Sequence, residues 1–413
     1  MTTDQTLVIV GASLAGAKAA EGARAGGFDG RVVLVGDEQE PPYERPPLSK
    51  AVLRGEAPPE TARVHDNGFY AARGIELWTG RTVEGLDPGT HHVRLDGDER
   101  LSFTTAVVAT GAAPRRLDIP GSDLAGVHYL RSVGDSVQLG DAIRTARRVA
   151  VIGAGWIGSE VAASARQMGA EVVLIDPAPT PLHRVLGDEI GKVFCRLHAD
   201  HGAQLRLRTG VAELRGNGTV QQVVLSNGDV EAADVVVIGV GVTPRVELAV
   251  AAGLKVENGI VVDEQLQSSV PGVYAAGDVA SAWHPHYGRY LRVEHWFNAV
   301  NQGLTAGSNA AGGSGRYTHL PYFFSDQYDL GMEYVGFSDP TDAVAVRGSL
   351  PDREFISFWH RDGIVTAAMN VNIWDVVDEL KAIVAGGRRL DPSRLADPDV
   401  ALADLASQES DDQ

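Results

Sequence analysis

Residues 149–176 are the part of the sequence that most constrains the fold. An apolar run, a glycine-rich turn, a stretch of small residues and a second apolar run predict strand, turn, helix and strand in succession. Gly153, Gly155 and Gly158 form an intact G-x-G-x-x-G, in which the glycines make the tight turn, admit a pyrophosphate and let the helix lie close to the strand. Asp176 ends the second apolar run, where a carboxylate accepts ribose hydroxyls. Glycines alone often mark ordinary turns, but with every flanking part in order the segment predicts a dinucleotide-binding unit.

A second copy of the motif lies near the start of the chain. Gly11, Ser13 and Gly16 follow an apolar run and precede an alanine-rich stretch suited to a helix packed tightly on a sheet. Serine at the middle position departs from the motif, although it is small enough to let a pyrophosphate approach. Asp37 follows the next apolar run and is the candidate for binding ribose, with Glu38 as its alternative.

The segments that follow the two units are also alike, which indicates an internal repeat. Asp-Gly at residues 96–97 and Asn-Gly at residues 227–228 each predict a β-hairpin. Residues 106–115 and 235–245 then each run from an apolar strand through glycine to a Pro-Arg pair. Two homologous nucleotide-binding domains explain this repeat better than chance. A chain with two dinucleotide sites is suited to pass electrons from one dinucleotide to the other.

Composition narrows the class of protein. A chain of 413 residues predicts two or three domains, and a net charge of −18 argues against nucleic acid and an anionic membrane surface as partners. Cys195 is the single cysteine, so an internal disulfide and a Cys-x-x-Cys redox pair are excluded; we interpret it as a packed small residue.

The first residues predict a strand and no signal peptide, and no apolar segment approaches membrane-spanning length. We therefore expect a cytoplasmic protein. The histidines lack an accompanying set of carboxylate or cysteine ligands, so no metal site is expected.

The remaining segments are a proline-rich loop and a third domain. Residues 41–50, PPYERPPLSK, hold too many prolines for a helix interior or a central strand and predict a rigid polar loop. From residue 322 the chain predicts a meander of strands, closed by a helix at about residues 373–384. The last ten residues are expected to be loose.

Taken together, the two glycine-rich units, RPPLSK at 45–50, ATG at 109–111, GVYAAGD at 272–278 and SDQYDLG at 325–331 resemble the NADH-dependent ferredoxin reductases of oxygenase systems. The putidaredoxin reductase and biphenyl dioxygenase reductase types belong to this group of FAD-dependent pyridine nucleotide oxidoreductases, and the wider group includes the apoptosis-inducing-factor-like proteins. The resemblance covers nearly the whole chain. It implies an α/β fold with two Rossmann-like domains, for FAD and NAD, and a C-terminal α+β domain. The implied boundaries are 1–114 and 244–318 for FAD, 115–243 for NAD, and 319–413 for the interface domain with its loose tail.

The resemblance also implies site residues. Those expected to bind FAD are Gly11, Ser13, Leu14, Ala15, Gly16, Asp37, Arg45, Lys50, Val83, Ala109, Thr110, Gly111, Arg131, Gly277, Asp278, Glu294, His295 and Trp296. Those expected to bind NADH are Gly153, Gly155, Trp156, Ile157, Gly158, Asp176, Arg184, Gly239, Gly241 and Glu294.

Two charged residues are the implied catalytic pair. The family's flavin-side lysine falls on Lys50 and its partner glutamate on Glu160. The two are expected to form a cross-domain ion pair, in which the lysine favours the anionic reduced flavin. Hydride transfer itself needs no acid, base or nucleophile from the protein, because the cofactors carry the chemistry. Where the family often has tryptophans, this chain has Tyr322 and Phe324.

The implied function is hydride transfer from NADH to FAD, followed by single-electron transfer to an iron–sulfur ferredoxin that feeds an oxygenase such as a cytochrome P450. Two alternatives stay open: another acceptor, such as a quinone, an ascorbyl radical or oxygen, and a redox-controlled binding protein of the apoptosis-inducing-factor type. Asp176 would repel a 2′-phosphate, so NADH is expected over NADPH, with Arg184 as the opposing charge.

The expected protein partner is a ferredoxin that docks transiently, and this chain is expected to be a monomer or homodimer. Ferredoxins are usually acidic, and so is this chain, so electrostatic docking requires a local basic face. The candidates are Arg289, Arg292, Arg316, Arg388, Arg389 and Arg394.

Overall fold

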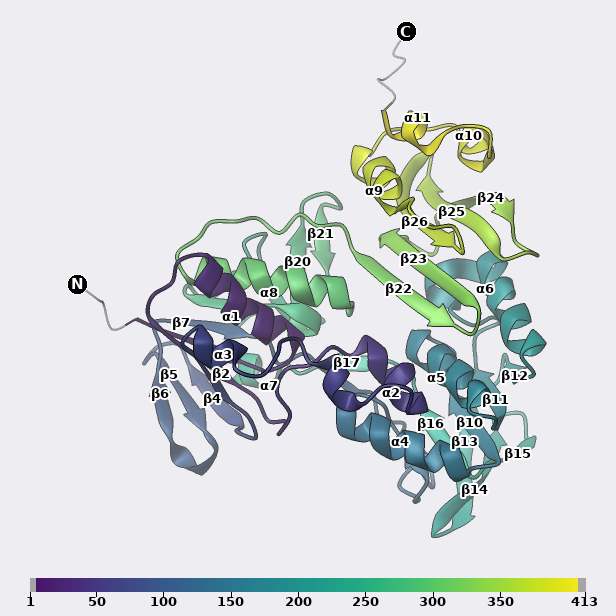
Figure 1. The fold of residues 1–413 in the computed structure, drawn as a ribbon, viewed down its shortest axis with the longest axis horizontal. Helices are drawn as coiled ribbons and strands as arrows, with labels where there is room; N and C mark the ends of the chain where they lie inside the picture. Colours follow the sequence, from purple (N-terminus) through teal and green to yellow (C-terminus); the bar gives the residue numbers. More distant parts are fainter. Residues whose placement is uncertain (1–4, 408–413) are drawn as a thin grey trace. The chain divides into compact units, whose positions relative to one another are not determined.

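The computed structural model describes residues 5–407 (Figure 1). The chain forms two compact units and passes repeatedly between them. The first unit contains the N-terminal residues to Arg45, Glu60–Ala113 and Val242–Pro321. The second contains Pro46–Pro59, Pro114–Gly241 and the residues from Tyr322 onward. The proline-rich loop is thus divided, because the chain enters the second unit directly after Arg45.

The first unit is built on a parallel sheet in the order β19-β7-β1-β2-β3. The first strand of the chain pairs with β2 on one side and β7 on the other, with Leu7 opposite Val32 and Thr105. Central strands of such a sheet are covered on both faces and therefore read as continuous apolar runs, as the sequence predicted. The sheet elements are β1 (Thr6–Val10), β2 (Arg31–Val35), β3 (Ile75–Trp78), β7 (Thr105–Val108) and β19 (Val273–Ala275).

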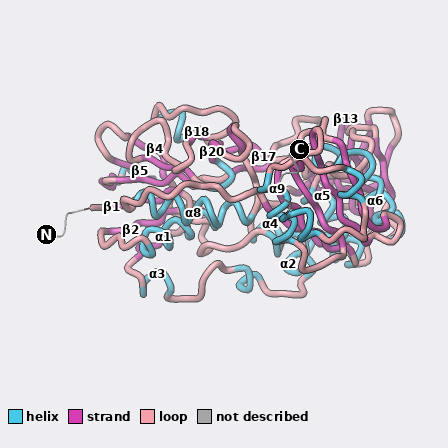
Figure 2. Tube along the Cα trace, turned by 90° about the horizontal axis from the view of Figure 1, so that it is seen from above, coloured by secondary structure: helices cyan, strands magenta, loops and turns pink. Residues whose placement is uncertain are grey.

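Helices α1 (Leu14–Ala25) and α8 (Trp296–Ala310) lie side by side in this unit (Figures 1 and 2). Their backbones approach so closely that a Cβ added at Gly307 would lie 1.9 Å from the carbonyl oxygen of Ala19. The alanine-rich sequence after the first turn therefore has a packing reason: larger side chains would separate the two helices.

The other elements of the first unit are short. They are α3 (Phe69–Ala72), β4 (Val83–Asp87), β5 (His92–Leu95), β6 (Arg100–Ser102), β17 (Val242–Pro244), α7 (Glu247–Ala251), β18 (Ile260–Val262), β20 (Ala280–His284) and β21 (Arg289–Leu291), with 3-10 turns at Asp96–Asp98 and Gly277–Val279. Strand β8 (Ala112–Pro114) and the 3-10 turn at Pro59–Ala62 each have one residue in the second unit.

The second unit repeats the pattern with a parallel sheet in the order β12-β11-β10-β16-β9. Here β10 lies between β11 and β16, as β1 lies between β2 and β7, which confirms the two Rossmann-like domains predicted from the repeat. The elements are β9 (Val127–His128), α4 (Val133–Thr145), β10 (Arg148–Ile152), α5 (Trp156–Gln167), β11 (Glu171–Asp176), α6 (His183–Asp200), β12 (Gln204–Leu207) and β16 (Val235–Ile238).

Both predicted hairpins are present. The turn at residues 96–97 joins β5 to β6, and the turn at residues 227–228 joins β14 (Thr219–Leu225) to β15 (Val230–Ala232). Strand β13 (Val211–Asn217) completes the second of these antiparallel sheets, and β4 completes the first.

The segment after Arg45 packs on α4 and α5 of the second unit. It forms a 3-10 turn, η1 (Pro46–Ser49), and a short helix, α2 (Ala51–Arg54). The Ser164 hydroxyl donates a hydrogen bond to the Ser49 carbonyl at 2.6 Å, and the Ser136 hydroxyl donates to the Leu48 carbonyl at 2.7 Å. These bonds fix the segment that carries Lys50.

The C-terminal part of the second unit is an antiparallel sheet in the order β22-β23-β26-β25-β24. Strand β23 pairs with β22 and β26, so the sheet departs from the simple meander that the sequence predicted. The strands are β22 (Tyr322–Gln327), β23 (Leu330–Gly336), β24 (Ala343–Ser349), β25 (Glu354–Arg361) and β26 (Ile364–Val371).

Short helices follow this sheet. Helix α9 (Val377–Gly386) begins later than the predicted residue 373, because Asn372 and Asp375 adopt left-handed backbone angles with φ of 51° and 62°. Helices α10 (Pro392–Ala396) and α11 (Leu402–Ser407) follow, so residues 404–407 are helical where looseness was expected; residues 408–413 lie outside the described part. Within residues 5–407, no helix combines the length and the apolar character needed to cross a bilayer.

Candidate functional site

The first glycine-rich turn brings the start of α1 onto the end of β1. Gly11 has φ of +112°, and a Cβ at this position would lie 2.2 Å from the carbonyl oxygen of Ala109. A Cβ at Gly16 would lie 1.9 Å from the carbonyl oxygen of Gly11. Only glycine fits at these two positions, so the backbone is shaped as a dinucleotide turn requires.

Ser13 occupies the middle position of this turn. It is the N-cap residue of α1, but its hydroxyl makes no capping bond to the helix. The hydroxyl instead accepts a hydrogen bond from the Arg45 guanidinium at 3.3 Å. Arg45 therefore brings a positive charge to the start of α1, where free N–H groups and the helix dipole already favour an anion. These residues fit the pyrophosphate of FAD.

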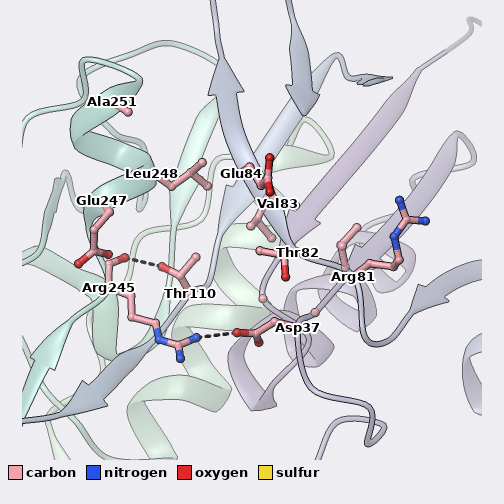
Figure 3. A pocket seen from close by; sticks show the side chains of 14 residues that line it. Asp37, Arg81, Thr82, Val83, Glu84, Thr110, Arg245, Glu247, Leu248 and Ala251 are labelled. Atoms are coloured by element: carbon pink, nitrogen blue, oxygen red, sulfur yellow. Dashed lines mark hydrogen bonds and ion pairs between the residues drawn. The ribbon is translucent and has the colours of Figure 1, made fainter. Parts of the chain in front are cut away.

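A cavity of about 430 Å³ continues from this turn (Figure 3). Asp37 projects toward it and forms an ion pair with Arg245, with 3.0 Å between the carboxylate oxygen and the guanidinium nitrogen. The Thr110 hydroxyl donates to the Arg245 carbonyl at 2.8 Å. The cavity is lined by Val10, Gly11, Val35, Gly36, Asp37, Arg81, Thr82, Val83, Glu84, Thr110, Arg245, Glu247, Leu248 and Ala251.

The alternative acid, Glu38, has other partners. Its carboxylate accepts a hydrogen bond from the Tyr43 hydroxyl and lies 3.6 Å from the Arg45 guanidinium. Asp37 lines the cavity and Glu38 is not among the lining residues, which favours Asp37 as the ribose ligand. This role stays a prediction.

Arg245 was not among the predicted site residues. One signal could have identified it: the repeat aligns the Pro-Arg pair at residues 244–245 with the pair at 114–115, directly after the strand and glycine of each domain. Its ion pair with Asp37 joins residues more than 200 positions apart, which no local pattern reveals.

Gly277 and Asp278 lie beside the start of α1. The Gly277 N–H donates to the Gln302 side chain at 2.9 Å, and a Cβ at Gly277 would lie 2.8 Å from that of Ala15.

Of the other predicted FAD residues in this unit, Leu14 and Ala15 begin α1, while Ala109 and Gly111 flank Thr110. Glu294, His295 and Trp296 lead into α8, and Glu294 forms an ion pair of 2.6 Å with Arg292.

The second glycine-rich turn has the same geometry around an open space. Gly153 has φ of +100°, and a Cβ there would lie 2.4 Å from the carbonyl oxygen of Gly239. A Cβ at Gly158 would lie 1.9 Å from the carbonyl oxygen of Gly153. At Gly155, by contrast, an added Cβ would meet no atom within 4 Å. The middle glycine thus leaves free the space that a pyrophosphate needs, and the turn fits NADH.

Asp176, the predicted ribose ligand of the second unit, is hydrogen-bonded to the glycine-rich turn. The Asp176 carboxylate accepts N–H hydrogen bonds from Ala154 and Ala178, both at 2.7 Å. Arg184 is exposed in the first turn of α6, and Gly241 has φ of +101° with open space around an added Cβ.

The residues that begin α5 differ in their surroundings. Ile157 has an exposed fraction of 47%. Trp156 makes edge contacts with Phe323 of β22 and Phe194 of α6, with ring centroids 4.7 and 6.3 Å apart. An exposed apolar side chain at a helix N-terminus is available to a bound nucleotide, whereas Trp156 links this helix to the C-terminal sheet.

The ion pair expected between Lys50 and Glu160 is present. The Lys50 ammonium lies 2.8 Å from a Glu160 carboxylate oxygen and 5.9 Å from the centroid of the Phe324 ring. Both charged residues belong to the second compact unit, as does Arg131. Glu160 projects from α5, the helix of the second glycine-rich turn. The pair's role at a flavin stays a prediction.

Comparison with protein families decides the assignment. A family model described as pyridine nucleotide-disulphide oxidoreductase matches residues 5–303, and a second model, described as reductase C-terminal, matches residues 322–406. The chain belongs to the pyridine nucleotide-disulphide oxidoreductase family.

Relatives within this family match over nearly the full length. The ferredoxin--NAD(+) reductase component of the anthranilate 1,2-dioxygenase system of Burkholderia cepacia is 39% identical, over 96% of this chain and 98% of its own length. Rhodocoxin reductase of Rhodococcus erythropolis is 36% identical, over 96% of this chain and 93% of its own. The structure is similar to that of the ferredoxin reductase for the CYP199A2 system of Rhodopseudomonas palustris, with a TM-score of 0.94, 34% identity and coverage of 98% and 100%. It is equally similar to the covalent putidaredoxin reductase–putidaredoxin complex, with a TM-score of 0.94, 34% identity and 98% coverage of both chains.

Despite the family's name, this member has no cysteine pair. Cys195 is half-buried in α6, and burial raises the pKa of its thiol, which disfavours the reactive thiolate. Among residues 5–407, no group of three or more histidine, cysteine, aspartate and glutamate side chains could hold a metal ion.

The six arginines proposed for docking are not equally available. Arg292 pairs with Glu294, Arg316 pairs with Glu264, and the Arg388 guanidinium donates to the Ala406 carbonyl. Arg389 is exposed, while Arg289 and Arg394 are partly buried.

Proposed function

We propose that this chain is an FAD-dependent ferredoxin--NAD(+) reductase, which takes hydride from NADH and passes single electrons to an iron–sulfur ferredoxin of an oxygenase system. The observation that carries the proposal is the match over nearly the whole length with ferredoxin reductase components such as that of the anthranilate 1,2-dioxygenase system. The putidaredoxin reductase–putidaredoxin complex supports a ferredoxin as the partner. An oxygenase such as a cytochrome P450 would be the final electron acceptor.

The chain's own residues would hold the two cofactors. Gly11, Ser13 and Arg45 would bind the FAD pyrophosphate, with Asp37 at the ribose, while Gly155 and its neighbours would bind NADH. When bound, FAD accepts a hydride from NADH and can release the electrons one at a time, which is chemistry that protein side chains do not supply.

Lys50 and Glu160 would set the charge around the flavin. A lysine ammonium near the ring favours the negative charge that develops on reduction, and Glu160 holds this ammonium at 2.8 Å. We expect that Lys50→Ala slows the reduction of bound FAD by NADH, while FAD stays bound through the glycine-rich turn. Stopped-flow rates equal to those of the parent would refute this role.

The finer features of the partner and the domains are also proposals. Residues 319–413 would form the interface domain that faces the ferredoxin. Residues 1–114 and 244–318 would together form the FAD domain, and residues 115–243 the NAD domain. We propose transient, electrostatic docking, a cytoplasmic location, and a monomer or homodimer.

The decisive experiment compares electron acceptors. The FAD-loaded protein is incubated with NADH and, separately, with an oxygenase-system ferredoxin, a quinone, ascorbyl radical or oxygen, and kcat/KM is measured for each. We expect ferredoxin to exceed the others by at least about tenfold, or about 1.4 kcal/mol of transition-state stabilisation. A kcat/KM for a quinone equal to that for ferredoxin would indicate that the physiological acceptor is not a ferredoxin. A reduced flavin that survives in air and reduces none of the acceptors would indicate a redox-controlled binding protein.

A further inference from the structure

Glu160 is a buried carboxylate with an unusual set of partners. Its exposed fraction is 5%, and burying a charge is costly unless the charge is paired and hydrogen-bonded. One carboxylate oxygen accepts from the Lys50 ammonium at 2.8 Å and from the Ser325 hydroxyl at 2.7 Å. The other accepts from the Ser49 hydroxyl at 2.5 Å. The carboxylate is thus held by one cation and two hydroxyls.

The two hydroxyls reach Glu160 from separate segments of the second unit. Ser49 ends the 3-10 turn η1 and Ser325 lies in the middle of β22, and both are almost fully buried. Neither residue follows from the phosphate-binding motifs, and neither was among the predicted site residues.

For the single hydroxyl proton of each serine, the Glu160 carboxylate offers the shortest hydrogen bond. The Ser49 hydroxyl lies 2.5 Å from this carboxylate and 3.5 Å from its other acceptor, the Pro46 carbonyl. The Ser49 carbonyl accepts from the Ser164 hydroxyl of α5 at 2.6 Å, which anchors the turn on the same helix that carries Glu160. The Ser325 hydroxyl accepts from the Gln327 amide at 3.4 Å, so its proton remains for the carboxylate. Strand pairing of Ser325 with Met332 of β23 holds the backbone in place.

We infer that Ser49 and Ser325 are positioning residues that act on the flavin through the Lys50–Glu160 ion pair. Their hydroxyl dipoles partly neutralise the carboxylate, so that less of the Lys50 charge is cancelled by Glu160. Without one hydroxyl, the carboxylate becomes locally more negative and opposes negative charge on a reduced flavin. The inference rests on the role proposed above for the ion pair.

The test measures the midpoint potential of bound FAD by equilibrium titration against a reference dye, which does not depend on turnover. Ser325→Val and Ser325→Thr make nearly the same steric change in a strand that tolerates β-branched residues, and only threonine keeps the hydroxyl. We expect Ser325→Val to lower the equilibrium constant for two-electron reduction about tenfold, a shift of about 30 mV to more negative potential. Ser325→Thr should keep this equilibrium constant within about twofold of the parent's value. Ser49→Ala should shift the midpoint potential in the same direction as Ser325→Val.

Two further variants make the result interpretable. Ser357→Ala is the matched control, because Ser357 is a fully buried serine of β25 whose hydroxyl makes no hydrogen bond within the described residues. It should leave the potential unchanged. Lys50→Ala is the positive control and should shift the potential at least as far as Ser325→Val.

The outcomes separate this inference from the proposal on which it rests. If Lys50→Ala shifts the FAD midpoint potential while Ser325→Val and Ser49→Ala leave it unchanged, the role of the serines alone is overturned. An unchanged Lys50→Ala would overturn the role of the ion pair itself. An equal shift in Ser325→Val and Ser325→Thr would show that packing, and not the hydroxyl, sets the potential. If the branched variants fail to retain FAD, Ser325→Ala is compared with Ser357→Ala by the same titration.

Discussion

At the scale of single residues, the three glycines of the second turn have different physical roles that substitutions can separate. Gly155→Val should fold and retain FAD, because an added Cβ there meets no atom within 4 Å. It should raise the dissociation constant of NADH by more than about tenfold, because the side chain occupies the pyrophosphate space. Titration of NADH into the yellow FAD-loaded protein measures this effect.

Gly158→Ala is the matched variant in the same turn. Its Cβ would lie 1.9 Å from the carbonyl oxygen of Gly153, so the helix must move and the protein should lose about 1–3 kcal/mol of stability. Thermal unfolding should distinguish the two variants. A Gly155→Val protein that binds NADH as the parent does would contradict the assignment of this turn to NADH.

Asp176 is expected to decide between the two nicotinamide dinucleotides. Its carboxylate accepts hydrogen bonds from the backbone N–H groups of Ala154 in the turn and of Ala178 just after the strand, and it would repel a 2′-phosphate. We expect kcat/KM for NADH to exceed that for NADPH by at least about tenfold, the size of one well-placed charge interaction. Asp176→Asn should narrow this ratio. It should also lower efficiency with NADH, because the amide nitrogen cannot accept one of the two N–H bonds. Equal efficiency of the parent with both nucleotides would refute the prediction.

The sequence predicted those residues whose role is local. The glycines of both turns could be assigned because each is required by backbone geometry within its own strand–turn–helix unit. The choice between Asp37 and Glu38 could not be made, because it depends on the direction of two adjacent side chains in a loop. Arg245, Ser49 and Ser325 escaped prediction because their partners are distant in sequence.

At the scale of elements, α6 carries a buried histidine that should make stability depend on pH. His198 is fully buried, and burial lowers its pKa to about 4 from the usual value near 6.5. Between these values the unfolded chain binds a proton that the folded protein does not bind. Stability is therefore greatest above pH 6.5 and falls as the pH falls toward 4, by about 2 kcal/mol at pH 5 for this residue.

The variant His198→Gln tests this pH dependence. It removes the titrating group, so the difference in unfolding free energy between pH 7 and pH 5 should be smaller in the variant than in the parent. Denaturant unfolding at the two pH values measures both differences. Equal differences in parent and variant would show that other groups cause the acid sensitivity.

Elements with strong periodicity were predicted well, whereas their ends and their order were not. The parallel strands and both hairpins follow from apolar runs and turn residues. The start of α9 was misplaced because left-handed Asn372 and Asp375 interrupt a helical pattern that the sequence alone continues. The position of β26 between β23 and β25 depends on pairing between distant strands, which local patterns do not encode.

At the scale of the whole molecule, the chain interleaves its two units. The segment after Arg45 leaves the first unit and joins the second, which is how Lys50 comes to contact Glu160 although the two belong to different predicted domains. Sequence order therefore does not reveal which compact unit a segment joins. The packing of Ser49 and Leu48 on α5 and α4 decides it.

Docking of the ferredoxin depends on the charge of the whole molecule. Because the chain has a net charge of −18, an acidic partner must meet a local basic surface. Rates with ferredoxin should then fall steeply as salt rises, since charges are screened over about 10 Å at 0.1 M ionic strength. Reduction of ferricyanide should be far less affected, because a small acceptor needs no docking surface.

Arg389 is the residue with which to test this docking. Reversal of both Arg388 and Arg389 would also break the bond from the Arg388 guanidinium to the Ala406 carbonyl, so Arg389→Glu alone is the cleaner variant. It should raise the KM for ferredoxin about three- to tenfold at low salt, the scale of one charge interaction, and leave ferricyanide reduction unchanged. Arg100→Glu is the control, because it changes the net charge equally at an exposed arginine of β6 outside the proposed docking set. If Arg389→Glu and Arg100→Glu give the same KM as the parent, Arg389 is not part of the docking surface; if both raise the KM equally, net charge and not a local surface governs the encounter.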